Sequence, residues 1–441
     1  MKSLREMLTM RKINLDRLLT IDVGKLESLC LIRRSTLAFA ILYCGILIAY
    51  LGSMEPWFMW SLSHYYPLIA CMLVILAWLM SRGLSERLFT RKSFKYPLIA
   101  YTVISLYLAV TGQVNMNGYI RVVFNMIVFT SVFSLDVRLL CKLMRWLCIT
   151  MAGMMLLSIP FYVLFLMGFN LPNSSVENES LMYSFYNYYF FLLDNRFTDA
   201  LLPRFHSVFL EPGHLGSACV FLLTTQISNW KKWYNIVLIV TVLITFSLAA
   251  YLLMVVVYFI SLWLRKKNIP VRLAIIGAVL VAGGIFAYNY NKGDNLFNLY
   301  ILERLTITDE GKFAGDNRVT DEFDDEFSDF MASGDILFGR KYEIVKYGWG
   351  NSGYRVFIYD YGLVFVLLLV IFYMVCSHEA VSTRARISMF ALGFATFWAR
   401  STLLDYFDFL PLYSFVYVVP YTLSHTLSHT LSGRLKMNSD E

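Results

Sequence analysis

Four side chains that can handle protons or phosphate lie within eleven consecutive residues of this sequence. The segment runs Arg204-Phe-His-Ser-Val-Phe-Leu-Glu-Pro-Gly-His-Leu-Gly216 and contains Arg204, His206, Glu211 and His214. A carboxylate becomes a useful base when a desolvated boundary raises its pKa, whereas a histidine titrates near neutral pH without such help. Glu211, His206 and His214 are therefore candidate catalytic bases, and the residue types alone do not decide among them.

The backbone of the same segment is suited to bind phosphate. Pro212 and Gly213 allow a helix to begin just after Glu211, which points the positive end of the helix dipole outward. A helix N-terminus beside the planar guanidinium of Arg204 is typical of a phosphate site. Two simpler interpretations stay open: Arg204 extends to lipid headgroups while the histidines sit at the interface, or Glu211 interacts only with the helix dipole.

The elements that position these residues are predicted to cross a lipid bilayer. The chain has 441 residues, of which 58% are hydrophobic and 16% charged, and its mean hydropathy is +0.58. Soluble domains have roughly 45–50% apolar and 25% charged residues, so this composition excludes an ordinary water-soluble core. The net charge of +7 comes from basic residues beside the apolar segments, which indicates membrane topology rather than binding of nucleic acid.

Eleven apolar segments are long enough to be considered as membrane helices. A span needs about 20 predominantly apolar residues. The candidates are 36–54, 57–80, 96–113, 118–134, 146–168, 213–229, 234–264, 272–290, 356–376, 387–403 and 408–425.

The segment 234–264 is too long for one ordinary helix. Basic residues flank both of its ends: Lys232 lies shortly before the segment and Arg265 directly after it. Because such residues mark the cytoplasmic side, both ends are expected there, and we predict a short hairpin that turns near Ser247. The fold class is then an all-α integral membrane protein with about 12 transmembrane helices, two long extracytoplasmic loops and both termini in the cytoplasm.

This topology divides the chain into seven regions. They are a cytoplasmic basic arm (1–35), the first five transmembrane helices (36–168), the first large extracytoplasmic loop (169–212), transmembrane helices 6–9 with the hairpin near 247 (213–290), the second large extracytoplasmic loop (291–355), transmembrane helices 10–12 (356–425) and a cytoplasmic tail (426–441). Loops of this length are usually functional or disordered, and their many aromatic residues favour order.

Other charged residues give weaker functional signals. Arg400 flanks the last two spans together with Asp405 and Asp408, and we expect a structural ion-pair group or, alternatively, part of an acceptor cavity. The acidic run from Asp321 to Glu326 lacks a recognisable ligand spacing, so we predict no metal and no cofactor. The seven cysteines lie in apolar runs or basic connections, which predicts no disulfide framework.

Four short motifs share their order and spacing with those of one family of membrane enzymes. They are Arg204…Phe209-Leu-Glu211-Pro212…Leu215-Gly216, Thr245-Phe-Ser247, Asn317-Arg318 with Ile336-Leu-Phe-Gly339, and Asn351…Tyr354…Tyr361-Gly362. In these residues the chain resembles the O-antigen and exopolysaccharide polymerases, which share a superfamily with the O-antigen ligases. The resemblance covers about 200–375 and the number of spans, whereas the first 200 residues match only in hydropathy.

The resemblance implies an enzyme that joins oligosaccharide repeat units carried on undecaprenyl pyrophosphate, at the outer face of a bacterial inner membrane. It implies that Arg204 and Arg318 hold the leaving pyrophosphate without a metal ion. Glu211 is preferred over the two histidines as the base, because its place before Pro212 resembles the family motif. The implied partners are the lipid-linked oligosaccharide, membrane lipid and, where the family uses one, a chain-length regulator protein.

Three further residues are candidates for binding the glycan. Arg340 either meets an anionic glycan or belongs to a solvated loop face, and Asn351 and Tyr354 belong to the fourth motif. Ligases of the superfamily carry a histidine directly before the asparagine that matches Asn351, whereas this chain has Gly350, which favours a polymerase. The alternatives are a ligase that transfers the glycan to another acceptor and a transporter or flippase of lipid-linked sugars. The long loop at 291–355 argues against transport.

Overall fold

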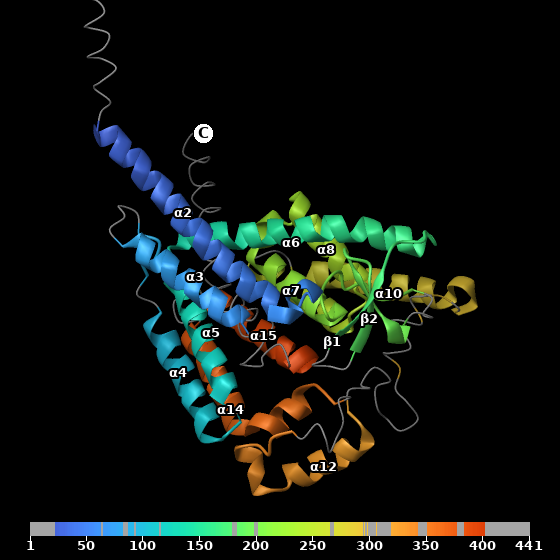
Figure 1. Cartoon of the computed structure of the whole chain (residues 1–441). Helices are drawn as coiled ribbons and strands as arrows, with labels where there is room; N and C mark the ends of the chain where they lie inside the picture. Colours follow the sequence, from blue (N-terminus) through green and yellow to red (C-terminus); the bar gives the residue numbers. More distant parts are fainter. Residues whose placement is uncertain are drawn as a thin grey trace, which may run out of the picture.

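A computed structural model gives the arrangement of most of the chain (Figure 1). The residues that it describes are 23–62, 65–82, 87–91, 94–113, 116–178, 183–197, 202–264, 269–293, 295, 298, 306, 319–342, 351–376 and 383–401. Most of the predicted basic arm lies outside these residues, as do the predicted span at 408–425 and the predicted tail at 426–441.

The described chain is mainly helical. Its α-helices are α2 (Val23–Gly52), α3 (Tyr66–Ser81), α4 (Lys95–Val110), α5 (Met116–Ser134), α6 (Val137–Leu166), α7 (Pro212–Thr225), α8 (Trp233–Ile244), α9 (Leu248–Leu264), α10 (Ile269–Asn289), α12 (Asp321–Met331), α14 (Tyr354–Cys376) and α15 (Thr383–Arg400). Short 3-10 helices are η1 (Trp57–Leu62), η2 (Asn195–Phe197), η3 (Ile227–Asn229), η4 (Tyr290–Gly293) and η6 (Gly334–Leu337).

The length and composition of these helices indicate a membrane protein. Within the described residues, four helical segments are long and apolar enough to cross a bilayer, namely Arg34–Gly52 in α2 together with α5, α6 and α14. Four more helices, α3, α4, α8 and α9, are apolar but shorter. The total of twelve spans stays a prediction.

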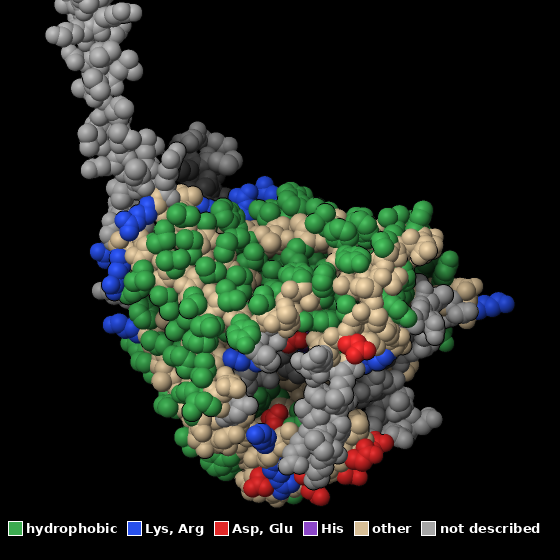
Figure 2. Space-filling model, viewed as in Figure 1, with side chains coloured by type: hydrophobic (Ala, Val, Ile, Leu, Met, Phe, Trp, Pro, Cys, Tyr) green, Lys and Arg blue, Asp and Glu red, His purple; other side chains and the backbone are tan. Residues whose placement is uncertain are grey.

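Large apolar side chains cover much of the outer surface, as Figure 2 shows for one face. Val110 of α4 is 86% exposed, Phe394 of α15 70% and Phe286 of α10 69%. Apolar surface on this scale is unfavourable in water, whereas lipid accepts it without cost. The exposed face of the helices is therefore consistent with a surrounding bilayer.

The first long loop adds a small antiparallel sheet to the helical fold. Its strands, in spatial order, are β1 (Ser174–Asn178), β2 (Tyr183–Asn187) and β3 (Leu192–Asp194). Aromatic residues favour strands, and Phe185 of β2 is fully buried against Leu192 and Leu210. This apolar cluster fixes the chain that leads from the sheet to α7.

The chain breaks between α8 and α9, in the segment where the hairpin is predicted. α8 ends at Ile244 and α9 begins at Leu248. The Thr245 hydroxyl donates to a carbonyl of α8 at 2.7 Å, and Phe246 has a φ of 47°, which redirects the chain. Both helices pack against α7, so the turn between them lies beside the segment that carries the candidate bases.

Basic connecting segments contact one another in pairs. Arg384, near the start of α15, donates to the carbonyl of Trp263 near the end of α9 at 3.1 Å. The backbone N–H of Asp136, just before α6, donates to the Leu88 carbonyl in the segment that follows α3 (3.0 Å). In Figure 2, Lys and Arg lie along the upper and left edges and also among the Asp and Glu of the lower end, where most of the visible Asp and Glu are found. Which of these faces is cytoplasmic stays a prediction.

The orientation can be tested at exposed positions. Ser247 at the turn is only 3% exposed, so cysteines are better placed at Ser175 and Ser328 for the outer face and at Lys232 and Thr383 for the cytoplasmic face. With the seven native cysteines replaced, we expect an impermeant thiol reagent to label the first pair in intact spheroplasts and the second pair only after lysis. Labelling of positions 175 and 232 from the same side would contradict the topology.

Candidate functional site

The segment before α7 is held in place by the small sheet and by α6. Leu192 of β3 donates its backbone N–H to the Ser207 carbonyl at 2.7 Å. The Tyr162 hydroxyl of α6 donates to the Pro203 carbonyl. Phe209 is fully buried in the main core. The side chains of this segment therefore have a fixed position relative to both elements.

α7 begins where the Pro-Gly pair predicts a helix start. Glu211 precedes the helix in an extended conformation (φ −135°, ψ 140°), and Pro212 is its first residue. The first helical hydrogen bond runs from the N–H of Leu215 to the Glu211 carbonyl at 3.2 Å. Because the first N–H groups of a helix have no partner within the helix, this end attracts negative charge.

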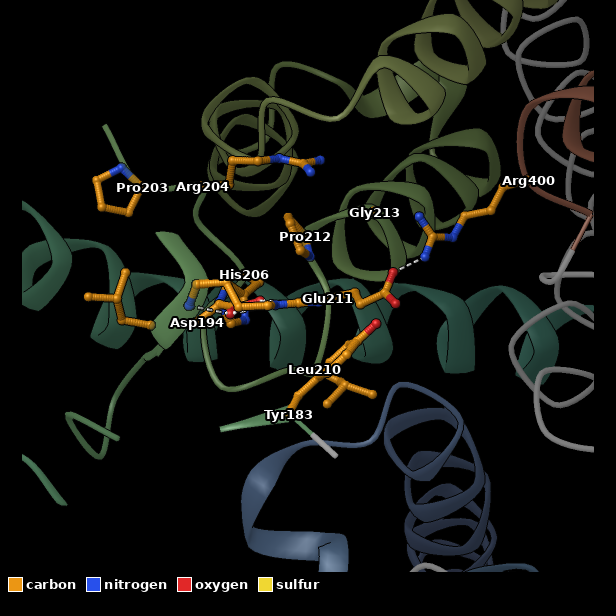
Figure 3. Close-up of a pocket in the computed structure, with 12 residues that line it drawn as sticks. Tyr183, Asp194, Pro203, Arg204, His206, Leu210, Glu211, Pro212, Gly213 and Arg400 are labelled. Atoms are coloured by element: carbon orange, nitrogen blue, oxygen red, sulfur yellow. Dashed lines mark hydrogen bonds and ion pairs between the residues drawn. The ribbon is translucent and has the colours of Figure 1, made fainter. Parts of the chain in front are cut away.

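A cavity of about 220 Å³ opens at this helix N-terminus (Figure 3). The residues that line it are Tyr183, Leu193, Asp194, Arg196, Pro203, Arg204, His206, Leu210, Glu211, Pro212, Gly213 and Arg400. Of the four residues that the sequence singles out here, Arg204, His206 and Glu211 line the cavity. The fourth, His214, is buried in the first turn of α7, with Nε2 4.0 Å from the Glu211 carboxylate.

The cavity also contains Arg400, the last residue of α15. Its guanidinium forms an ion pair and a hydrogen bond with the Glu211 carboxylate, drawn as a dashed line in Figure 3. The partners predicted for Arg400, Asp405 and Asp408, lie outside the described residues. The partner in the structure instead lies 189 residues earlier in the chain. No local sequence pattern predicts a contact between residues so far apart in the chain.

Arg400 keeps Glu211 ionised. Burial acts to raise the pKa of Glu211, but the Arg400 guanidinium and, to a smaller extent, His214 outweigh it and lower the pKa from 4.5 to about 2. The side chains are 35% exposed for Glu211 and 16% exposed for Arg400, so solvent screens part of the attraction. In this state Glu211 is a good hydrogen-bond acceptor and a weak base.

His206 is held as a neutral imidazole. Its side chain is buried, and its Nδ1 lies 2.5 Å from the Phe209 carbonyl oxygen. Because a carbonyl only accepts hydrogen bonds, Nδ1 must carry the proton, which leaves Nε2 as the acceptor of the neutral ring. Burial lowers the pKa of His206 below 6.5 and keeps the ring uncharged at neutral pH.

Two further arginines reach the cavity from other elements. The Nε of Arg204 donates to the Thr245 carbonyl at 3.3 Å, which ties its side chain to the turn between α8 and α9. Arg196 forms an ion pair with Asp194 at 2.6 Å and lies over the ring of Tyr183, 3.7 Å from the centroid. The cavity is thus lined by three guanidiniums and two carboxylates, which suits an anionic ligand.

Two other residues that the sequence predicts to bind substrate, Arg318 and Arg340, are not among the described residues that line this cavity. Arg318 lies outside the described residues. Arg340 forms ion pairs with Glu326 of α12 (3.0 Å) and with Asp335 (2.7 Å). These carboxylates hold Arg340 within the second loop, so its role in binding glycan stays a prediction. Among the described residues, no three His, Cys, Asp or Glu side chains come together as metal ligands.

The fourth motif joins the second loop to the membrane helices. Asn351 accepts the backbone N–H of Thr320 at 2.6 Å and donates to the Tyr342 hydroxyl at 2.9 Å, so it closes the loop around α12. Tyr354, at the start of α14, stacks on Trp398 of α15 with 5.0 Å between ring centroids. The loop therefore returns beside the helix that ends in Arg400, and glycan binding by Asn351 and Tyr354 stays a prediction.

Comparisons of the chain with family models, curated proteins and solved structures find no match. The functional argument therefore rests on the geometry of the cavity and on the motifs of the sequence.

The close approach of Arg400 to α7 can be tested at Gly213. A Cβ at this position would overlap the Arg400 guanidinium, so Gly213→Ala should displace Arg400 from Glu211. The guanidinium is the end of a flexible side chain and can move away, so we expect the loss of a partly exposed ion pair, about 1 kcal/mol, seen as a lower midpoint of thermal unfolding. Gly153→Ala in α6, where a Cβ meets open space, is the control and should leave the midpoint unchanged or slightly raised. Equal midpoints for the two variants would refute the close approach.

The ion pair also predicts how stability depends on pH. The pKa of Glu211 is depressed in the folded protein, so its contribution to stability is present above about pH 4.5 and is lost as the pH falls toward 2. We expect Glu211→Gln to unfold at a lower temperature than wild type at pH 7, because Arg400 loses its counter-charge, and the difference should shrink below pH 4.5. Glu177→Gln, on the exposed face of β1, is the control. A difference that is constant across this range would contradict the ionised pair.

Proposed function

We propose that this chain is a polysaccharide polymerase that joins oligosaccharide repeat units carried on undecaprenyl pyrophosphate, at the extracytoplasmic face of a bacterial inner membrane. The motifs of the sequence suggest the reaction, and the observation that carries the proposal is the cavity in which Arg204, His206, Glu211 and Arg400 meet at the start of α7. Transfer of a glycan from a pyrophosphate carrier requires a place for the leaving group and an acceptor for one proton. The cavity offers side chains for both tasks.

Arg204 and Arg400 are the residues that we assign to the pyrophosphate. Their planar guanidiniums can each donate two parallel hydrogen bonds to phosphate oxygens, and the N-terminus of α7 adds positive potential at the same place. The resemblance adds Arg318 as a third donor from the second loop. An arrangement of this kind stabilises the charge on the leaving group without a metal ion.

Binding of the donor would change the state of Glu211. In the structure, Arg400 is engaged with the Glu211 carboxylate, and a pyrophosphate in the cavity would compete for the same guanidinium. Once Arg400 turns to the phosphate, Glu211 loses the main charge that lowers its pKa, and burial then raises the pKa. The donor thus converts Glu211 from a weak base into a stronger one, at the moment when a base is needed.

The proposed step is a single displacement. An oxygen of the acceptor hydroxyl bonds to the anomeric carbon of the donor glycan, while the bond from that carbon to the pyrophosphate oxygen breaks. The electron pair of the broken bond leaves with the pyrophosphate, and the proton of the hydroxyl moves to Glu211 or, alternatively, to Nε2 of His206. The products are a glycan that is longer by the transferred sugars and a free undecaprenyl pyrophosphate.

The role of the two arginines can be tested with charge-conserving variants. Arg204→Lys and Arg400→Lys keep the positive charge but lose the paired N–H donors of the planar guanidinium, so each variant should lower polymer formation roughly tenfold or more. Arg138→Lys, at an exposed position in the first turn of α6, is the matched control and should stay near wild type. The double variant should lose less than the sum of the single losses in free energy, because both donors act on one leaving group. The measurement is the glycan ladder on a gel, corrected for the amount of each variant in the membrane.

Three outcomes would count against this function or its mechanism. Wild-type ladders from well-expressed Arg204→Ala and Arg400→Ala proteins would contradict the mechanism. A pulse-labelled glycan that leaves the lipid carrier for another acceptor, with no lengthening on the carrier, would identify a ligase instead. Repeat units that accumulate unextended at the cytoplasmic face of cells without the protein would identify a flippase.

A further inference from the structure

A second cavity, of about 430 Å³, lies between the start of α6 and the end of α7. It is lined by Cys141, Lys142, Met144, Arg145, Trp146, Thr225, Gln226 and Asn229. Two of these side chains are cationic and three carry hydroxyl or amide groups, and no acidic side chain is among the described residues that line the cavity. Such a lining suits an anion that presents several oxygen atoms.

The two cations of this cavity are positioned by aromatic residues. The Nζ of Lys142 lies 4.6 Å from the ring centroid of Phe39 and 5.0 Å from that of Trp146. The charge of Arg145 interacts with the Tyr234 hydroxyl at the start of α8. Cation–π contacts restrain a lysine while leaving its N–H donors available on the other side. Both cationic side chains are exposed, so a ligand can reach them.

The carbonyl groups at the C-terminal end of α7 repel an anion less than those of an uncapped helix would, because side chains of the protein donate hydrogen bonds to them. The Leu223 carbonyl accepts a hydrogen bond from Nε1 of Trp230 at 3.0 Å. The Leu222 carbonyl accepts one from the Thr225 hydroxyl at 2.7 Å. Donors from the protein therefore neutralise part of the negative end of the helix dipole.

The position of the cavity points to lipid as the source of the anion. It lies in the first turns of α6, a helix long and apolar enough to cross a bilayer, and next to Phe39 of α2, which holds another such segment. Trp146 lines it, and tryptophan is typical of the boundary between membrane and water. The cations belong to a basic connection that the topology places on the cytoplasmic side, where anionic lipids bind basic pockets between helices.

We propose that this cavity binds the phosphate of an anionic membrane phospholipid at the cytoplasmic end of α6 and α7. It is a different site from the cavity at Glu211, since the two lie at opposite ends of α7, roughly 20 Å apart along the helix axis. A bound headgroup bridges α6 and α7 through Lys142, Arg145 and the polar groups that end α7. The lipid therefore stabilises the packing of the helix that carries the catalytic segment.

The test uses the full chain in nanodiscs of phosphatidylcholine with increasing phosphatidylglycerol, and it measures the midpoint of thermal unfolding. Phosphatidylglycerol should raise the midpoint of the wild type by mass action. The variant Lys142→Gln/Arg145→Gln should need roughly thirtyfold more phosphatidylglycerol for the same shift, which corresponds to about 2 kcal/mol. Lys231→Gln/Lys232→Gln removes two exposed charges outside the cavity and should behave like wild type. Midpoints in phosphatidylcholine alone identify any variant that is unstable in itself.

Three results would overturn the proposal. Equal losses in the two double variants would mean that only the overall charge of the surface attracts lipid. A shift of the wild type by inorganic phosphate that depends on Lys142 and Arg145 would mean that the ligand is a soluble phosphate. The Lys142→Gln/Arg145→Gln protein can prove unstable in itself. In that case the single variant Lys142→Gln is compared with wild type by native mass spectrometry, which measures how much phosphatidylglycerol each protein retains. Equal retention by the two proteins would count against the site. None of these measurements depends on polymer formation.

Discussion

The ion pair between Glu211 and Arg400 holds together parts of the chain that are far apart in sequence. It ties the start of α7 to the end of α15. Removing two charges from water is costly, and the cost is recovered only when the geometry is good and both partners are present. The structure meets this demand with a glycine at position 213, which leaves room for the guanidinium beside the helix backbone. The cavity exists in its present form because these two helix ends meet.

α7 is the element around which the rest of the site is arranged. Its residues from Gly213 to Thr225 are buried on every side, which is typical of a helix at the centre of a bundle rather than at its surface. α6, α8 and α9 pack against it. A helix enclosed in this way cannot tilt freely, so the groups at its two ends keep a fixed separation. A ligand bound at one end of α7 is therefore connected to a ligand at the other end through this one rigid helix.

The sequence reveals the local features of the site and misses the distant ones. The start of α7 follows from Pro212 and Gly213, and the break after α8 follows from basic residues at both ends of an overlong apolar segment. The small sheet was not predicted, because aromatic residues in a loop indicate order without specifying strands. The pairing of Arg400 with Glu211 depends on how α15 packs, and neither residue type nor spacing encodes it.

The short length of α8 has a consequence for the lipid around the protein. Its 12 residues span about 18 Å, well below the roughly 30 Å of a bilayer's hydrocarbon core. Membranes adapt to such a mismatch by thinning beside the protein. The turn after α8, which accepts a hydrogen bond from Arg204, then sits at the floor of a local depression in the membrane. Under the proposed function, a polyprenyl carrier would bring its pyrophosphate to that depth while its tail stays in hydrocarbon, and the deformed membrane would help to deliver the substrate.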